Sequence, residues 1–117
     1  MSDCIFCKIA SGEVPAELLY EDDNVVAFPD LNPQAPVHVL VVPKAHHENF
    51  VDDVPAQTLL SMERAVRSVA ERYGLDEKGF RCVMNTGEAA GQTVMHLHMH
   101  VLGGRPLGEG LLPEVRA

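Results

Sequence analysis

The segment MHLHMHVL, residues 95–102, places His96, His98 and His100 at every second position between apolar residues. This alternation predicts a β-strand, because successive strand side chains point to opposite faces of a sheet. The three imidazoles would then share one face while the apolar residues pack into a core. Neutral imidazole can act near pH 7 as a base, a metal ligand or a nucleophile toward phosphorus. The alternative interpretation is three half-buried strand histidines with no chemical role.

A polar turn, TGEAAGQT, leads into this segment and is suited to binding a phosphate. The backbone N–H groups around Gly91 and the side chains of Gln92 and Thr93 are hydrogen-bond donors, and Asn85 adds another. His98 is predicted to be the nucleophile, because neighbours on both sides can orient its ring. Charge stabilisation would come from these fixed donors, so the scheme requires no metal for catalysis.

The N-terminal pair Cys4 and Cys7 predicts a second site. A spacing of three residues puts both thiols on one face of a helix, and two thiolates are half of a tetrahedral zinc site. The remaining ligands would come from the histidines of PKAHHEN or of the triad. Packed free thiols and redox exchange are the alternatives.

Composition limits the class of protein. The chain has 117 residues and a net charge of −8, which argues against binding to nucleic acid polymers or anionic membranes. Residues 1–117 are predicted to form a single domain with its own core. The start, MSDCIFCKIASGE, does not resemble a secretory signal, and three cysteines do not form a disulfide framework, so a cytoplasmic location is expected.

The local patterns predict two helices and five strands. The helices are expected at 4–10, capped by Asp3, and at 55–73, and the strands at 18–22, 25–30, 37–43, 80–85 and 93–102. In the long helix, an apolar stripe is expected from Leu59, Met62, Val66, Val69 and Tyr73. The predicted fold is α+β, a mostly antiparallel five-stranded sheet with one long helix and one short N-terminal helix on one face.

The stretch GQTVMHLHMHVLGGRPLG resembles the signature of the histidine triad (HIT) nucleotide-binding proteins, and most closely their Hint branch. CIFCKIASGEVPAELLYEDD, AFPDLNPQAPVHVLVVPKAH and MNTGEAAGQ match the family in the same order. The resemblance implies an α+β fold that dimerises into a continuous sheet. It also implies hydrolysis of purine nucleoside phosphoramidates or aminoacyl adenylates to AMP through a nucleotidyl-histidine intermediate.

The resemblance also implies roles for individual residues. His98 would be the nucleophile, His38 would form a catalytic relay with His96, and His100 would contact the phosphate. The ribose and base would be held by Asp30 and Leu31, and the phosphate by Asn85, Gly91, Gln92 and Thr93. A structural zinc would be bound by Cys4, Cys7, His46 and His96.

Two features depart from the Hint branch. Thr93 stands where Ser is frequent, and the tail LGEGLLPEVRA lacks the Trp-Pro-Pro-Gly ending of animal relatives, so the leaving-group preference does not carry over. Two other functions compete with the phosphoramidate hydrolase. One is hydrolysis of dinucleoside polyphosphates or nucleotidyl transfer by the same triad. The other is a zinc- and nucleotide-binding protein without physiological turnover, in which all three histidines bind zinc.

Overall fold

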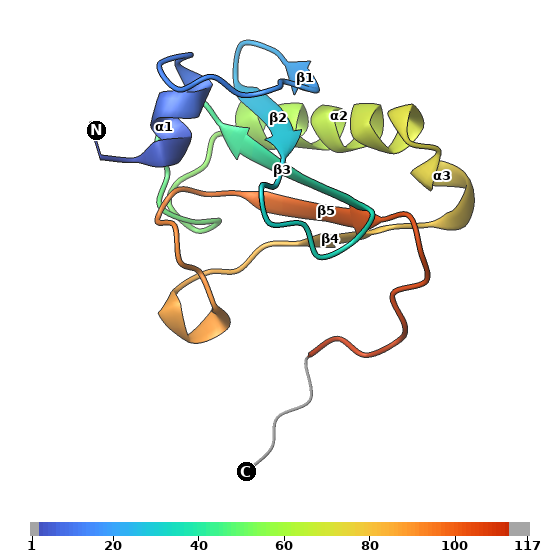
Figure 1. Cartoon of the computed structure of the whole chain (residues 1–117). Helices are drawn as coiled ribbons and strands as arrows, with labels where there is room; N and C mark the ends of the chain where they lie inside the picture. The colour runs from blue at the N-terminus through green and yellow to red at the C-terminus, as the bar shows by residue number, and fades with distance from the viewer. Residues whose placement is uncertain (1–2, 113–117) are drawn as a thin grey trace.

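The computed structural model describes residues 3–112, which form one antiparallel sheet with three α-helices (Figure 1). The strand order is β1-β2-β3-β5-β4. The strands are β1 (Tyr20–Glu21), β2 (Val25–Pro29), β3 (Val37–Pro43), β4 (Arg81–Val83) and β5 (Met99–Gly103). The predicted α+β class and the five antiparallel strands are confirmed.

The helices cover both faces of the sheet, whereas the sequence predicted helices on one face only. The helices are α1 (Ile5–Ala10), α2 (Ala56–Arg72) and α3 (Leu75–Lys78), with a 3-10 turn η1 at Glu88–Ala90. In Figure 1, α2 runs behind the sheet and α1 lies near the opposite face of β3. The physical reason is that β2 and β3 are apolar on both sides, since Val25 to Phe28 are all buried, so each face requires a cover.

Two hydrophobic clusters result, one on each face. The larger one packs α2 and α3 against the sheet and contains Val25, Val39, Val41, Met62, Val69, Leu75, Leu97 and Val101, among others. The smaller one packs α1 against the other face through Phe6, Val26, Phe28, Leu40 and Val42. The second face also carries His38 and His100, because these residues alternate with Val39 and Val101 along β3 and β5.

The long helix is one residue shorter at each end than predicted, and its buried face is shifted. Met62 and Val69 are buried as expected, but Leu59 and Tyr73 are exposed. Small and polar residues are buried in their place: Thr58, Ser61, Ala65 and Ala70. Small side chains let α2 approach the sheet closely, and Ser61 accepts a hydrogen bond of 3.0 Å from the Asn24 amide. None of the helices within residues 3–112 is long and apolar enough to cross a membrane.

The first helix begins at Ile5 with Cys4, not Asp3, as its N-cap. The Cys7 backbone N–H donates to Cys4 Sγ over 3.4 Å, so the sulfur takes the place that a capping oxygen usually fills. This cap turns the Cys4 thiol toward the next turn of the helix and brings it close to Cys7.

The last strand is much shorter than the predicted 93–102, because it begins only at Met99. Residues 92–98 form an irregular segment that is anchored to the loop after β3 by a 2.6 Å hydrogen bond from the Leu97 N–H to the His47 carbonyl. His96 therefore lies outside the regular alternation. His98 also precedes the strand, so the prediction that three histidines lie on one strand is wrong for both His96 and His98, and only His100 lies on β5.

Candidate active site and metal cluster

A chain of hydrogen bonds fixes His38 and His100. The Gln34 backbone N–H donates to His38 Nδ1 over 3.0 Å, so the neutral ring carries its hydrogen on Nε2. His38 Nε2 lies 2.9 Å from His100 Nδ1 and 3.4 Å from Asp30 Oδ2. His100 Nδ1 is thus an acceptor, and its Nε2–H remains available as a donor to a ligand. The Asp30 carboxylate is held by the Asn32 N–H at 2.8 Å.

One ring nitrogen of His98 forms a hydrogen bond, and the other has no hydrogen-bond partner within residues 3–112. Its Nδ1 lies 2.8 Å from the backbone carbonyl of His96, and since a carbonyl only accepts, the hydrogen is on Nδ1. The lone pair of Nε2 is then available for attack. The rings of Phe6 and His100 each pack edge-on against His98 with centroids 5.1 Å apart. This geometry suits the nucleophile predicted from the sequence.

His96 points away from the other two histidines of the triad. Its Nε2–H donates to the Pro43 carbonyl over 2.8 Å, and its Nδ1 lies 3.2 Å from Cys4 Sγ and 3.5 Å from Cys7 Sγ. The relay that we expected between His38 and His96 is not what the structure shows, because His38 bonds to His100 instead. The imidazole of His96 belongs to the metal cluster, and its contact with His98 runs through its backbone carbonyl.

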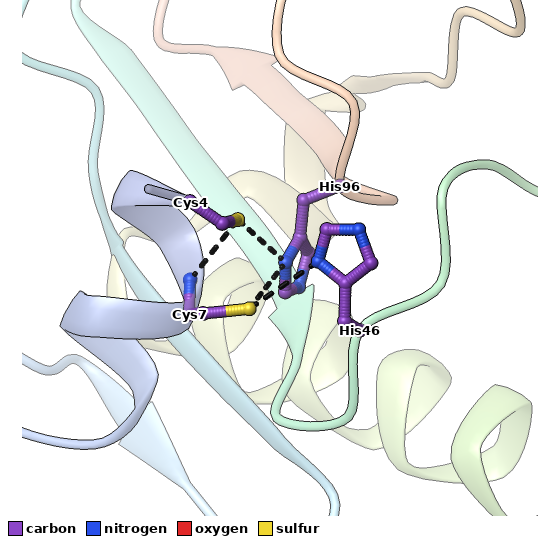
Figure 2. Close-up of side chains that lie close together, drawn as sticks. All are labelled: Cys4, Cys7, His46 and His96. Carbon is purple, nitrogen blue, oxygen red and sulfur yellow. Dashed lines mark hydrogen bonds between the residues drawn. The ribbon is translucent and has the colours of Figure 1, made fainter. Parts of the chain in front are cut away.

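Four side chains converge beside α1 and form the metal cluster: Cys4, Cys7, His46 and His96 (Figure 2). Cys4 caps α1 and Cys7 lies within it, while His46 comes from the loop after β3 and His96 from the segment before β5. Their ligand atoms all lie within 4.8 Å of one another. Cys7 Sγ is 3.3 Å from His46 Nδ1, close to the separation of about 3.5 Å expected between sulfur and nitrogen in tetrahedral zinc. The residues therefore fit a zinc ion.

The protonation of the cluster agrees with this fit. Burial lowers the pKa of His96 to about 4, so its Nδ1 lone pair is unprotonated and faces the thiols. Burial and the neighbouring Cys4 raise the pKa of the Cys7 thiol, and a bound cation would reverse this by favouring the thiolate. His46 is exposed, which opens one side of the cluster to an entering ion.

A second group of metal-ligand types, Asp30, His38 and His100, lies nearby. Two ring nitrogens bound to one zinc would stand about 3.3 Å apart, whereas 2.9 Å between His38 and His100 is a hydrogen bond. His38 therefore uses its Nε2–H for a hydrogen bond to His100, with Asp30 close by, and the three residues do not have the spacing of zinc ligands. Within residues 3–112, His96, His98 and His100 do not form one metal-ligand group, so the alternative of three histidines on one zinc is wrong.

A cavity of about 520 Å³ opens in front of His98 and His100. It contains five of the residues predicted from the sequence to bind nucleotide: Asp30, Leu31, Thr93, His98 and His100. Its apolar wall comes from Ile5, Phe6 and Ile9 of α1, Phe28 of β2, Leu40 of β3 and Val94. The arrangement combines a nucleophile, a hydrogen-bond donor, a carboxylate and an apolar wall, which suits a nucleotide-sized ligand.

The comparisons with known proteins agree with this geometry. Residues 11–107 match the family model described as HIT domain. The chain belongs to the HIT family. Purine nucleoside phosphoramidase of Escherichia coli strain K12 is 46% identical to this HIT protein over 109 residues, which cover 91% of each. Protein HitA of Neisseria gonorrhoeae is also 46% identical, over 88% of this chain and 97% of HitA.

Solved structures of HIT proteins share the fold. A HIT family hydrolase from Clostridium thermocellum is 48% identical and matches with a TM-score of 0.90 over 96% of this chain and 99% of its own. A histidine triad protein from Clostridium difficile is 45% identical, with a TM-score of 0.87 over 94% and 97% of the two chains. The resemblance to histidine triad proteins is confirmed, and this HIT protein is a hydrolase.

Gln92 is not free to contact a phosphate as predicted. Its side chain is buried, with 2% of its surface exposed, and its amide is fully engaged. Oε1 accepts from the Gly87 N–H, and Nε2 donates to the carbonyls of Glu48 and Val94. The amide therefore links the turn to the loop after β3. The sequence alone could not show this, because Glu48 is 44 positions away.

Asn85 and Gly91, the other two predicted phosphate residues, do not line the 520 Å³ cavity. Gly91 ends η1 in the left-handed conformation at a φ of 94°, so its identity is explained by the turn. Sequence reasoning in turn missed the apolar wall from α1. The spacing of Ile5, Phe6 and Ile9 on one short helix was the available signal, but it indicated core packing equally well.

Burial also keeps the two paired histidines of the HIT site neutral. It lowers the pKa of His38, partly offset by the Asp30 carboxylate, and it lowers the pKa of His100, with the His98 and His38 rings adding to the effect. Neutral rings preserve the tautomers set by the hydrogen bonds. His100 can then donate through Nε2 near pH 7.

Proposed function

We propose that this HIT protein hydrolyses the P–N bond of purine nucleoside phosphoramidates, or the acyl-phosphate bond of aminoacyl adenylates, and releases AMP. The observation that carries the proposal is the free Nε2 of His98, which is left unprotonated by the bond from Nδ1–H to the His96 carbonyl. This nitrogen belongs to a residue that lines a nucleotide-sized cavity. The name of the Escherichia coli relative, purine nucleoside phosphoramidase, supports the substrate class.

In the proposed first step, Nε2 of His98 attacks phosphorus and the P–N bond breaks. The leaving amine takes up a proton from solvent, and the product is a nucleotidyl-histidine. The Nδ1–H bond to the His96 carbonyl stabilises the positive charge that the ring gains. Water then attacks phosphorus, the bond to Nε2 breaks, and AMP and neutral His98 are released while a proton from the water returns to solvent.

His100 would stabilise the phosphate during both steps. Its Nε2–H is the donor available to a phosphate oxygen, because its Nδ1 accepts from His38. His38 would act through His100, with its own tautomer set by the Gln34 N–H and with the Asp30 carboxylate 3.4 Å from its Nε2. Thr93 lines the same cavity, and its hydroxyl would be a second donor to the phosphate.

The nucleoside would occupy the rest of the cavity. Phe6, Ile9 and Phe28 offer an apolar wall for the base, and Asp30 offers a carboxylate acceptor for ribose hydroxyls. Leu31 follows Asp30 and is fully exposed at the cavity, where it would cover a bound base. We propose that Asn85, Gly91 and Gln92 shape the turn TGEAAGQT that leads to Thr93, without contacting the phosphate through their side chains.

Zinc would be held by Cys4, Cys7, His46 and His96, and we propose that its role is structural. It would connect α1 to the loop after β3 and to the segment before β5. None of the reacting groups is among its four ligands, so catalysis would proceed without the metal. Thiols that must stay reduced to bind zinc suit a reducing compartment such as the cytoplasm.

We propose a single domain over residues 1–117 that dimerises through its sheet. Strand β4 lies at one end of the strand order, and among residues 3–112 no strand pairs with its outer edge. Cys82 on this strand and Phe80 just before it are exposed. Such an edge favours pairing with a second copy. A monomer mass by light scattering at micromolar concentration would contradict the dimer.

Measuring AMP release from adenosine 5′-phosphoramidate at pH 7 tests the proposed function. We expect turnover by the wild type with and without EDTA, and a loss of several orders of magnitude in kcat for His98→Ala. His47→Gln is the matched control, because its ring lies outside the cavity and should leave kcat unchanged. Equal rates for His98→Ala and wild type would contradict the nucleophile. Faster turnover of a dinucleoside polyphosphate would favour the alternative hydrolase.

A further inference from the structure

His96 connects two sites through three of its polar atoms. Its Nδ1 faces the two thiols of the metal cluster at 3.2 and 3.5 Å, and its Nε2–H is fixed by the Pro43 carbonyl at 2.8 Å. Its backbone carbonyl accepts the Nδ1–H of His98 at 2.8 Å. The residue is fully buried, so its ring has no freedom to turn without breaking these contacts. The cluster and the nucleophile therefore share one rigid residue.

The first helix provides a second connection between the same two sites. Phe6 lies between Cys4 and Cys7 in the sequence and is buried against the sheet. Its ring packs edge-on against His98 at 5.1 Å and against His96 at 5.9 Å, centroid to centroid. Any shift of the two thiols moves the helix turn that carries Phe6. The packing against His98 would change with it.

We propose that His96 is a positioning residue that couples occupancy of the metal cluster to the tautomer and orientation of His98. A neutral imidazole has two tautomers, and only the one with its hydrogen on Nδ1 leaves Nε2 free to attack. The His96 carbonyl selects this tautomer, and its position depends on the contacts that fix the His96 ring. A metal bound by Cys4, Cys7 and His46 would hold that ring. The effect on kcat rests on the proposed function, whereas the effect on the His98 tautomer does not.

The coupling predicts that metal removal slows catalysis without abolishing it. Because His98 keeps its own side chain, the metal-free protein should retain turnover, with kcat lowered about tenfold and KM within about twofold. A metal that merely stabilised the fold would leave kcat of the folded protein unchanged. The split between kcat and KM thus separates positioning from stability.

The test combines nitrogen NMR of histidine-labelled protein with kinetics, for zinc-loaded and EDTA-treated wild type and for Cys7→Ser. In the loaded protein we expect a protonated Nδ1 and an unprotonated Nε2 on His98. In the EDTA-treated protein and in Cys7→Ser we expect the Nδ1 and Nε2 shifts of His98 to be averaged, because both tautomers are then populated. Cys82→Ser is the matched control, since this cysteine lies on the edge strand β4 outside the cluster and should match wild type in both readouts.

Two results would overturn the coupling. One is unchanged His98 nitrogen shifts and kcat in folded metal-free protein, and the other is a failure of the wild-type protein to bind added zinc. If Cys7→Ser and the metal-free protein do not fold, cadmium in place of zinc provides the same test. Longer metal–thiolate bonds should shift the His98 nitrogen signals, and identical signals would contradict the proposal. If no phosphoramidate is cleaved, the proposed function fails, but the NMR comparison still decides the coupling.

Discussion

Nε2 of His38 lies 2.9 Å from Nδ1 of His100, which joins two histidines that stand 62 positions apart in the chain. The pairing of β3 with β5 brings them together, since His38 lies opposite Leu102 and His100 lies opposite Leu40. One N–H···N bond then decides that His100 donates through Nε2. The hydrogen-bond donor that His100 offers, as a residue lining the cavity, is thus set by a residue on a neighbouring strand.

Replacing His38 should impair the donor role of His100. We expect His38→Phe, which keeps a ring of similar size, to lower kcat for adenosine 5′-phosphoramidate by about 10- to 100-fold, because His100 loses the partner that fixes its tautomer. Steady-state kinetics at pH 7 would measure this effect. His47→Phe serves as the control for a histidine outside the cavity. An unchanged kcat in His38→Phe would show that His100 needs no orienting partner.

Acidification should destabilise the metal-free protein. Burial lowers the pKa of both His38 and His100 below the ordinary value of 6.5. As the pH falls through 6.5, the unfolded chain binds protons that the native rings do not, so the free energy of unfolding decreases until the lowered native pKa values are reached. Urea unfolding in EDTA between pH 7.5 and 5 should show this decrease. A variant with His100→Gln should show a weaker dependence on pH, and an equal dependence would contradict the assignment.

Substitutions of the neighbours Gln92 and Thr93 should affect different properties, stability for Gln92 and catalysis for Thr93. Gln92→Leu should lower the free energy of unfolding by about 1–3 kcal/mol, because the N–H of Gly87 and the carbonyls of Glu48 and Val94 lose their partner. Thr93→Ala removes an exposed hydroxyl at the cavity and should affect kcat or KM while leaving stability within about 0.5 kcal/mol. Urea denaturation and kinetics on both variants would separate these roles. A Gln92→Leu protein as stable as wild type would contradict the buried bridge.

Loss of the metal cluster should reduce stability and metal content together. Protein purified without chelator is expected to contain about one zinc per chain, and Cys4→Ser should contain much less. The melting temperature of Cys4→Ser should fall, because α1 is short and its closure onto the sheet would depend on the cluster. Elemental analysis and thermal unfolding would test both statements. Cys82→Ser, which leaves the cluster intact, should match wild type in zinc content.

Local patterns in the sequence determined much of the architecture. The apolar run of β3 predicted that strand within its observed bounds, and the long amphipathic helix was placed to within one residue at each end. Cys4 and Cys7 were predicted to lie on one side of a short N-terminal helix, and they do lie close together, with Cys4 as the N-cap of α1 and Cys7 in its first turn. These features depend on residues a few positions apart, which a sequence displays directly.

The tertiary structure decided how the site residues are shared between two functions. His96 looked equivalent to His98 and His100, but Cys4, 92 positions away, and Pro43, 53 positions away, hold its ring in the metal cluster. Gln92 looked like a phosphate donor, but Glu48 uses its amide. In each case a contact with a distant segment fixes the direction of a side chain. The spacing of residues along the chain carries no information about such contacts, because folding alone brings the partners within hydrogen-bonding distance.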